Sequence, residues 1–327
     1  MQEINGFTYI SELKERAKSY DVLAMYVLGV TYEEGRYTPI DIDQAIYWFE
    51  KAANAGDVHS QLHLASLLRI EACYEEMFFW LGEAAKKSHV QAEYRLGYCY
   101  EIGLGTEIDY GFAESWYLRA ARKGDREALF RLAYLYHRNL CSSPDQGTAL
   151  RYFRRAANQG HLEALTFLAE YYEKGIVVFR NYEKAFRFYK KAAEGGLPAA
   201  QFCLGQMFQF GMGVKKSESE GALWISRAAE QGFVPALYLK SLICLKGLGE
   251  PRSICDACMW FLLGKKLDTG LSPALDNMKK QLQSECTGLA SEKEWKEAAN
   301  MAVKWFEDGS NFENMEKNFL WGPDQAD

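Results

Sequence analysis

The chain has 327 residues, of which 48% are hydrophobic and 25% charged, and its formal net charge is −6. This composition argues against wholesale disorder, and the acidic balance disfavours a general binder of nucleic acid or of anionic membranes. No apolar run approaches the ~18–20 residues that span a bilayer, and the first five residues lack the basic start of a signal peptide. The sequence therefore predicts a cytoplasmic protein without membrane insertion.

The eight cysteines are irregularly spaced. Disulfide scaffolds serve small domains, whereas this chain is long enough to bury a core without them. We therefore interpret most of the cysteines as reduced, small core residues.

The first predicted element is a lone helix over residues 8–19. Shifting the first repeat back by 36 residues places Leu13 on Phe49 and Ala17 on Ala53. A stack of repeats needs atypical ends that cover its apolar face. Residues 1–21 are therefore expected to form an N-terminal capping helix.

Repeats follow over residues 22–266. An Ala-Ala pair recurs at steps of 32, 36, 36, 36 and 36 residues from Ala52-Ala53 to Ala228-Ala229, with an aromatic residue four positions before each pair. A leucine followed by glycine or alanine recurs in a second register from Leu28 to Leu204. Periods of about 20–50 residues are the signature of a solenoid, and the segment holds seven such repeats.

Each repeat is interpreted as two helices joined by a loop. Leu204 and Phe208 recur at helical spacing in the first helix, and Trp224 and Ala228 in the second, so we expect the aromatic ring and the alanine to share the buried face. The first helix is expected to end at a residue that tolerates the left-handed conformation, namely Gly35, Gly103, Asn139, Gly175, Gly211 or Gly247. Six residues later stand preferred N-cap residues for the second helix: Asp41, Asp109, Asp145, Asn181, Ser217 and Ser253.

The 32-residue step is explained by one short loop. Leu28 and Trp48 are 20 residues apart, whereas Leu64 and Trp80 are only 16 apart. The four missing residues are therefore expected in the loop of the second repeat, around residues 70–74.

After Trp260 the repeat pattern decays. Two helices are expected over residues 273–286 and 291–307, within a C-terminal cap that covers residues 267–307. Trp295, Ala298, Ala302 and Trp305 form its final apolar stripe. Residues 308–327 are expected to be a loose polar tail. The predicted fold class is all-α, a solenoid of about seven helix-turn-helix repeats with capping helices.

The repeat unit resembles the Sel-one-like repeat (SLR) family, α-solenoid relatives of the tetratricopeptide repeat. The resemblance is carried by Gly211-Met212-Gly213 in the loop and by the Ala-Ala-x-x-Gly ending from Ala228 to Gly232. Similar units recur at 91–124 and 163–196. The resemblance implies a right-handed α-solenoid, or α/α superhelix, that acts as a protein-interaction scaffold, with some relatives in bacterial signalling, host interaction or toxin immunity.

The candidate partner-binding residues lie on the first helices, which line the concave side of stacked helical pairs. Aromatic residues interspersed with polar groups make a plausible protein-binding groove. The alternative is that the aromatic residues pack between repeats. The candidates are Tyr26, Tyr94, Tyr98, Glu101, Phe130, Tyr134, His137, Glu170, Phe202, Gln206, Gln209 and Tyr238.

Catalytic and metal motifs are sparse. Cys255 and Cys258 form a CxxC at a predicted helix start, where a thiolate would be stabilised. Ser11 and Lys14 match the SxxK of penicillin-recognising enzymes without the other motifs of that class. His59 and His63 have metal-ligand spacing but lie outside an HExxH frame. We interpret all three as structural or coincidental, and we expect no catalytic residue, metal or cofactor.

Charge is segregated along the chain. Residues 1–118 hold 9 basic and 19 acidic residues, whereas residues 119–191 hold 15 basic and 7 acidic ones. Many of the central basic residues fall on second helices, where a solvated convex face is the usual explanation and an acidic protein partner the next.

We therefore predict a non-catalytic scaffold or adaptor that binds a partner protein in its concave groove. A bacterial immunity protein that neutralises a cognate toxin is the alternative within the same class. A β-lactamase-like hydrolase is the alternative from the class of enzymes.

Overall fold

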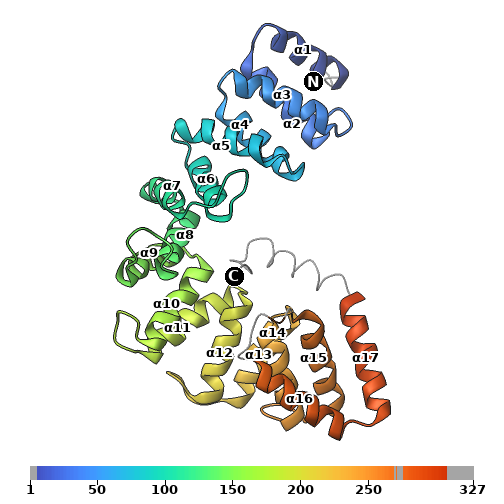
Figure 1. Cartoon of the computed structure of the whole chain (residues 1–327). Helices are drawn as coiled ribbons and strands as arrows, with labels where there is room; N and C mark the ends of the chain where they lie inside the picture. Colours follow the sequence, from blue (N-terminus) through green and yellow to red (C-terminus); the bar gives the residue numbers. More distant parts are fainter. Residues whose placement is uncertain (1–5, 269, 271–274, 308–327) are drawn as a thin grey trace, which may run out of the picture. The chain divides into compact units, whose positions relative to one another are not determined.

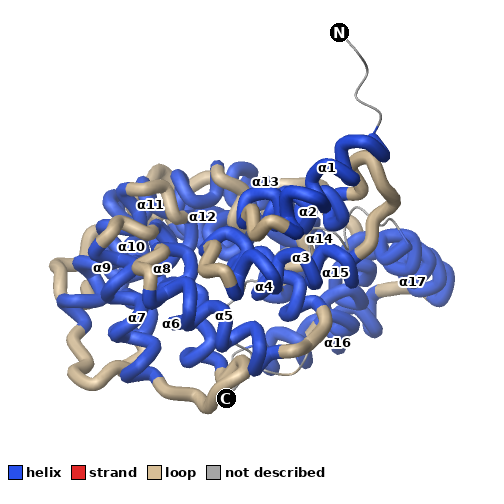
Figure 2. Tube along the Cα trace, turned by 90° about the horizontal axis from the view of Figure 1, so that it is seen from above, coloured by secondary structure: helices blue, strands red, loops and turns tan. Residues whose placement is uncertain are grey.

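The computed structural model describes residues 6–268, 270 and 275–307. Within these ranges the chain forms seventeen helices and no strand, joined by loops (Figures 1 and 2). Consecutive helices pack on one another from α1 to α9 and from α10 to α15, as in an all-α solenoid. The fold class predicted from the repeat pattern is thus confirmed, whereas the expected polar tail, residues 308–327, lies outside the described residues.

The helices α2 to α15 form seven consecutive pairs. In each pair the first and second helix are antiparallel neighbours joined by a loop. The pairs are α2 (Val22–Glu34) with α3 (Ile42–Asn54), α4 (Val58–Ile70) with α5 (Tyr74–Lys86), α6 (Val90–Ile102) with α7 (Tyr110–Arg122), α8 (Arg126–His137) with α9 (Gln146–Asn158), α10 (Leu162–Lys174) with α11 (Tyr182–Glu194), α12 (Pro198–Phe210) with α13 (Glu218–Glu230) and α14 (Val234–Lys246) with α15 (Ile254–Leu267).

The capping helices lie close to where they are expected. The leading helix α1 (Gly6–Lys18) packs on α2 and buries Leu13 and Ala17. At the other end α16 (Asp276–Leu289) and α17 (Glu292–Glu307) both pack on α15. The α17 contact buries Ala298 and Ala302 of the predicted stripe, while Trp295 and Trp305 stay half-buried.

The chain divides into two compact units, the N-terminal unit of residues 1–159 and the C-terminal unit of residues 160–327. The N-terminal unit contains α1 to α9, and the C-terminal unit contains α10 to α17. The repeat pattern gave no sign of this division, because the 36-residue step continues through it.

Caps and loops follow the sequence pattern. The side chains of all six expected N-cap residues accept a hydrogen bond from a backbone N–H in the first turn of the second helix. The glycines that end the first helices, and Asn139 at the same position, have φ between 58° and 74°. The α4–α5 loop spans residues 71–73, against residues 103–109 between α6 and α7, which confirms the shortened loop.

The second helices bury a different ring from the expected one. The Ala-Ala pairs are at most 3% exposed throughout. The aromatic residue four positions before each pair is only half-buried in five of the seven repeats. In one of them this residue is Trp224, and the Arg227 guanidinium lies 4.5 Å from the centre of its ring. The fully buried side chain is the next residue, such as Phe49, Tyr117 or Ile225, because it lies against the glycine that follows the register leucine on the preceding helix.

Candidate partner-binding surface

Three candidate tyrosines lie on first helices of the N-terminal unit. Tyr26 belongs to α2, and Tyr94 and Tyr98 lie one turn apart on α6. All three side chains are half-buried. We call these three residues together the tyrosine face.

The Tyr26 ring packs between two repeats. Its centroid is 6.0 Å from that of Phe49 on α3 and 5.7 Å from that of His63 on α4. His63 Nδ1 lies 3.0 Å from Glu33 Oε2, which ties α4 to α2. Burial raises the pKa of Tyr26, so its hydroxyl stays protonated and able to donate a hydrogen bond.

Tyr98 and Tyr94 stand over a buried ion pair. Arg131 of α8 and Glu101 of α6 are 5% and 4% exposed, with 3.3 Å between Arg131 Nη1 and Glu101 Oε1. The Arg131 guanidinium also lies 5.0 Å from the centre of the Tyr98 ring, and Tyr117 donates a hydrogen bond from its hydroxyl to Glu101 Oε2. Burial raises the pKa of Tyr94 to about 12. Glu101 is therefore a core residue that supports the tyrosine face from beneath.

The α8 candidates are placed mainly in the core. Phe130 and Tyr134 are buried, and the Phe130 ring lies 6.1 Å from the Phe153 ring. Arg138 covers the Tyr134 ring at 5.9 Å. His137 is half-buried, and its ring is 6.1 Å from that of Phe153. Of these three candidates, His137 alone keeps a substantial exposed surface.

The candidates of the C-terminal unit differ in exposure. Glu170, Phe202, Gln206 and Gln209 are half-buried, and Glu170 pairs with Lys174 one turn further along α10. The Phe202 ring packs 5.6 Å from that of Phe233. Tyr238 is 1% exposed and donates its hydroxyl to Asp268 Oδ2 at 3.2 Å. Tyr238 thus belongs to the core of this unit, together with Phe261.

Two arginines of this surface were not among the candidates from the sequence. Arg131 holds Glu101 and Tyr98 together, and Arg95 of α6 donates a hydrogen bond from Nη1 to Ser66 Oγ at 2.8 Å. Both occupy the position directly before the register leucine of their repeat. That shared offset was a usable signal, although a single sequence does not show which side the residue faces.

The cysteine motif at 255–258 does not form an activated thiol pair. All eight cysteines are free. Burial raises the pKa of Cys255, and it raises that of Cys258 to about 12. Cys255 Sγ packs 3.8 Å from Met301 Sδ on α17. Reactive thiols have lowered pKa values, so these environments are typical of structural cysteines.

In the SxxK motif and the His59–His63 pair, Lys14 and His63 pack against aromatic rings. Ser11 is exposed on α1, and Lys14 Nζ lies 5.5 Å from the centre of the Tyr32 ring. His63 stacks on Phe49 with 4.9 Å between ring centres. In the part of the chain that the structure describes, no group of three or more His, Cys, Asp or Glu residues is arranged to hold a metal ion.

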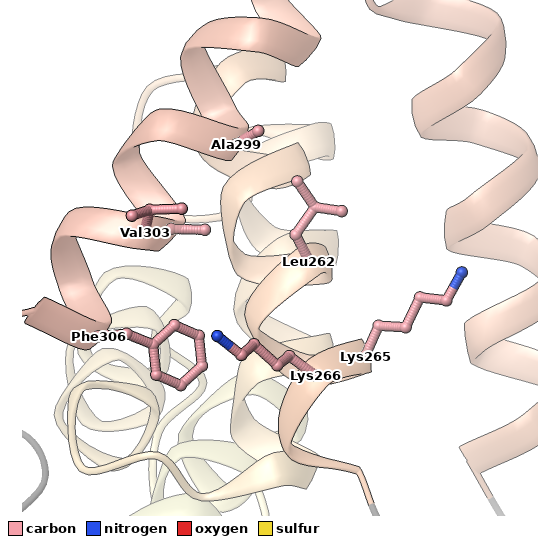
Figure 3. Close-up of a pocket in the computed structure, with 7 residues that line it drawn as sticks. Leu262, Lys265, Lys266, Ala299, Val303 and Phe306 are labelled. Carbon is pink, nitrogen blue, oxygen red and sulfur yellow. The ribbon is translucent and has the colours of Figure 1, made fainter.

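A shallow cavity of about 300 Å³ lies between α15 and α17. Figure 3 shows its lining, with Lys266 extending toward Phe306, and Lys266 Nζ is 3.8 Å from the centre of that ring. The rest of the lining is mainly apolar, formed by Leu262, Lys265, Ala299, Ala302 and Val303.

Across residues 6–268, 270 and 275–307, no helix has the length and hydropathy needed to cross a membrane.

The central basic residues lie on second helices. They are exposed, as expected for a solvated helix surface, and Arg155 lies 5.7 Å from the centre of the Tyr152 ring. These residues are Arg151, Arg154 and Arg155 on α9 and Arg187, Lys190 and Lys191 on α11.

Consecutive helix pairs with buried Ala-Ala pairs, joined by loops whose glycines have positive φ, are typical of α-solenoid repeat proteins. The Sel1 repeat model matches residues 22–57, 90–125, 126–161, 162–197 and 198–233, which is more than half of the chain. The chain therefore belongs to the Sel1 repeat family, as the resemblance in the sequence indicated. Proteins built from these repeats generally act as interaction scaffolds and not as enzymes.

Solved structures share the fold. A Sel1 repeat protein from Oxalobacter formigenes superimposes with a TM-score of 0.66 and 23% identity, over 94% of each chain. The protective antigen c5321 of uropathogenic Escherichia coli, which displays an SLR fold, gives a TM-score of 0.58 and 24% identity over 99% of this chain and 76% of its own. At this identity the likeness concerns the fold.

Among curated proteins, a sel1-like repeat-containing protein of Acanthamoeba polyphaga mimivirus is 30% identical over 100 residues. The match covers 29% of this chain and 19% of the viral protein. The match leaves most of both proteins unmatched.

Proposed function

We propose that this chain is a non-catalytic adaptor that binds another protein through its first helices, with the tyrosine face as the principal contact. The observation that carries the proposal is that Tyr26, Tyr94 and Tyr98 are half-buried on first helices and fixed by packing. Tyrosine supplies contact area at low conformational-entropy cost, most of all when its ring is already held in place.

The buried candidates support this surface without contacting the partner. Glu101 joins α6 to α8 through Arg131, and Phe130 packs on Phe153 of α9 in the N-terminal unit. Tyr134 is covered by Arg138, and Tyr238 donates a hydrogen bond to Asp268 in the core of the C-terminal unit. The half-buried His137, Glu170, Phe202, Gln206 and Gln209 are proposed as further contact residues.

The absence of catalysis is part of the proposal. It is supported by the raised pKa values of Cys255 and Cys258 and by the Lys14 ammonium, which faces the Tyr32 ring. A cytoplasmic location is proposed as well, and the eight free thiols agree with a reducing compartment.

The test is affinity capture from the native cell, with the full chain as bait and mass spectrometry as readout. Tyr98→Ser should lower the yield of the bound partner at least about tenfold, because an aromatic hot spot is worth 2 kcal/mol or more. Tyr47→Ser is the matched control, since Tyr47 is exposed on the second helix α3.

Unchanged capture by Tyr98→Ser, with the helical circular dichroism spectrum retained, would refute the tyrosine face as the contact. Loss of capture by Tyr47→Ser alone would place the contact on the second helices instead. A toxin is the more specific partner suggested by the family resemblance. It would be recognised by a captured protein whose toxic activity the purified chain suppresses.

A further inference from the structure

Neighbouring first helices of the N-terminal unit are joined by a repeated polar contact. A carboxylate at one position of a first helix pairs with a basic side chain 30 residues later, on the next first helix. Between α2 and α4 the pair is Glu33 and His63, with 3.0 Å between Oε2 and Nδ1. Between α6 and α8 it is Glu101 and Arg131, with 3.3 Å between Oε1 and Nη1.

Between α4 and α6 the same two positions hold two arginines. Arg69 occupies the carboxylate position on α4, and Arg95 occupies the basic position on α6. They are 26 residues apart instead of 30, because the α4–α5 loop is four residues shorter. This contact therefore holds two basic side chains, whereas each neighbouring contact pairs one basic side chain with one carboxylate.

The two guanidinium groups are left without a carboxylate partner. Arg95 is half-buried and donates to Ser66 Oγ, whereas Arg69 is exposed. Neither takes part in any ion pair within residues 6–268, 270 and 275–307, although residues 1–118 hold 19 acidic residues. Burial and the nearby charge of Arg69 both lower the pKa of Arg95, so the two charges repel. Like charges at a shared site cost stability unless an anion binds between them.

We propose that Arg69 and Arg95 bind a carboxylate of the partner protein, in the place that Glu33 and Glu101 fill in the neighbouring contacts. The proposal rests on the protein-binding role of the tyrosine face, since Tyr94 and Tyr98 flank Arg95 on α6. A guanidinium presents a planar fork that matches a carboxylate, and the two groups together offer several free N–H donors. The ligand is thus an aspartate or glutamate side chain, or a C-terminal carboxylate, on an acidic segment of the partner.

The probe is a library of random peptides displayed on phage and selected against the full chain. Selected peptides are then synthesised with a fluorescent label and titrated by anisotropy against the wild type, Arg69→Glu, Arg95→Lys and Arg122→Glu. Arg122 is exposed on the second helix α7, so its reversal is the matched change of charge away from the tyrosine face.

We expect the selected peptides to share one acidic position. Arg69→Glu should weaken their binding at least about tenfold, Arg95→Lys less, and Arg122→Glu less than twofold. Replacing the shared acid by its amide should weaken wild-type binding but not weaken the binding to Arg69→Glu any further, because Arg69→Glu already removes the attraction and adds a repulsion that the amide relieves.

Each other outcome counts against one of the two proposals. Peptides that depend on Tyr98 but tolerate Arg69→Glu, or that share no acid, overturn the carboxylate site and leave the adaptor role standing. Peptides that depend on neither Tyr98 nor the arginines overturn the tyrosine face as well. Failure to select any peptide also counts against the carboxylate site. Circular dichroism of each variant verifies that the helices remain folded.

Discussion

The ion pair between Glu101 and Arg131 shows how one residue can connect packing to a surface. Both charges are removed from water, and they stabilise each other, while the Tyr117 hydroxyl donates a further hydrogen bond to Glu101. The net value of such a pair relative to apolar residues is small, but removing one partner leaves a buried charge uncompensated. Arg131 in turn supports the ring of Tyr98.

Glu101→Gln should therefore lower the free energy of unfolding by about 3 kcal/mol. Urea denaturation followed by circular dichroism measures it. Glu15→Gln is the control, because Glu15 pairs with Lys18 on the surface at 2.6 Å, where such a pair contributes about 0–1 kcal/mol. Equal losses in the two variants would contradict the buried-charge account.

The cysteines give a second prediction at this scale. Cys73 is exposed, whereas Cys258 is fully buried with a pKa of about 12. At about pH 8 only some 10⁻⁴ of the Cys258 thiol is ionised. Iodoacetamide should modify Cys73 first and Cys258 more slowly by a factor of about 10³ or more, as mass spectrometry of the digested protein would show.

The chain unfolded in urea is the control, and all eight cysteines should react there at similar rates. Rapid labelling of Cys258 in the folded chain would instead revive the redox interpretation of the CxxC.

At the scale of elements, the loops of three repeats lie in close contact with the repeat before them. Gly105, Gly213 and Gly249 all have positive φ. A Cβ at any of them would collide with a carbonyl oxygen at the start of the preceding second helix, such as that of Tyr182 for Gly213. The first and fifth repeats differ, because Tyr37 and Val177 occupy the equivalent positions with φ of 63° and 60°.

Gly213→Ala should destabilise the chain by about 2–4 kcal/mol, from backbone strain of about 1–2 kcal/mol together with the collision. Gly196→Ala separates the two effects. Its φ is 94°, but nothing lies within 4 Å of the added carbon, so only the strain of about 1 kcal/mol remains. Thermal unfolding measures both, and a Gly213→Ala loss no larger than that of Gly196→Ala would mean that the loop moves aside at no cost.

At the scale of the whole molecule, cores form between neighbouring repeats instead of at one centre. Each second helix packs on the first helix of its own repeat and on that of the next within a unit. Stability in such a chain is close to a sum of local terms. The net charge of −6 is likewise a sum, of acidic first and last parts and a basic middle.

A destabilising substitution should therefore lower the stability mainly of the repeats next to it. In the Gly213→Ala variant, we expect hydrogen exchange to accelerate most in α11 to α13, which flank the altered loop, and least in α2 and α3. Amide exchange with mass spectrometry resolves this gradient. Uniform acceleration over the described helices would show that the chain unfolds as a single cooperative unit.

Much of the architecture follows from local rules that a single sequence displays. The six N-caps, the left-handed glycines and the short loop at residues 71–73 are determined by nearby residues, so periodicity alone located them. The candidate surface was predicted less well, because its register positions were identified without knowing their exposure. Phe130 and Tyr134 occupy the same register positions as Tyr94 and Tyr98, yet they are buried while the tyrosines of α6 remain half-exposed.

The amino-acid sequence by itself determined the helices, their pairing and the repeat period, since these depend on spacings of a few residues and on recurring small side chains. The tertiary structure alone decided which side chain of each second helix is buried and which acidic residue pairs with which basic residue. It also decided that the contact between α4 and α6 has no carboxylate. Those outcomes depend on contacts between residues 20 to 30 positions apart on neighbouring helices, and no local rule fixes how two helices rotate against each other.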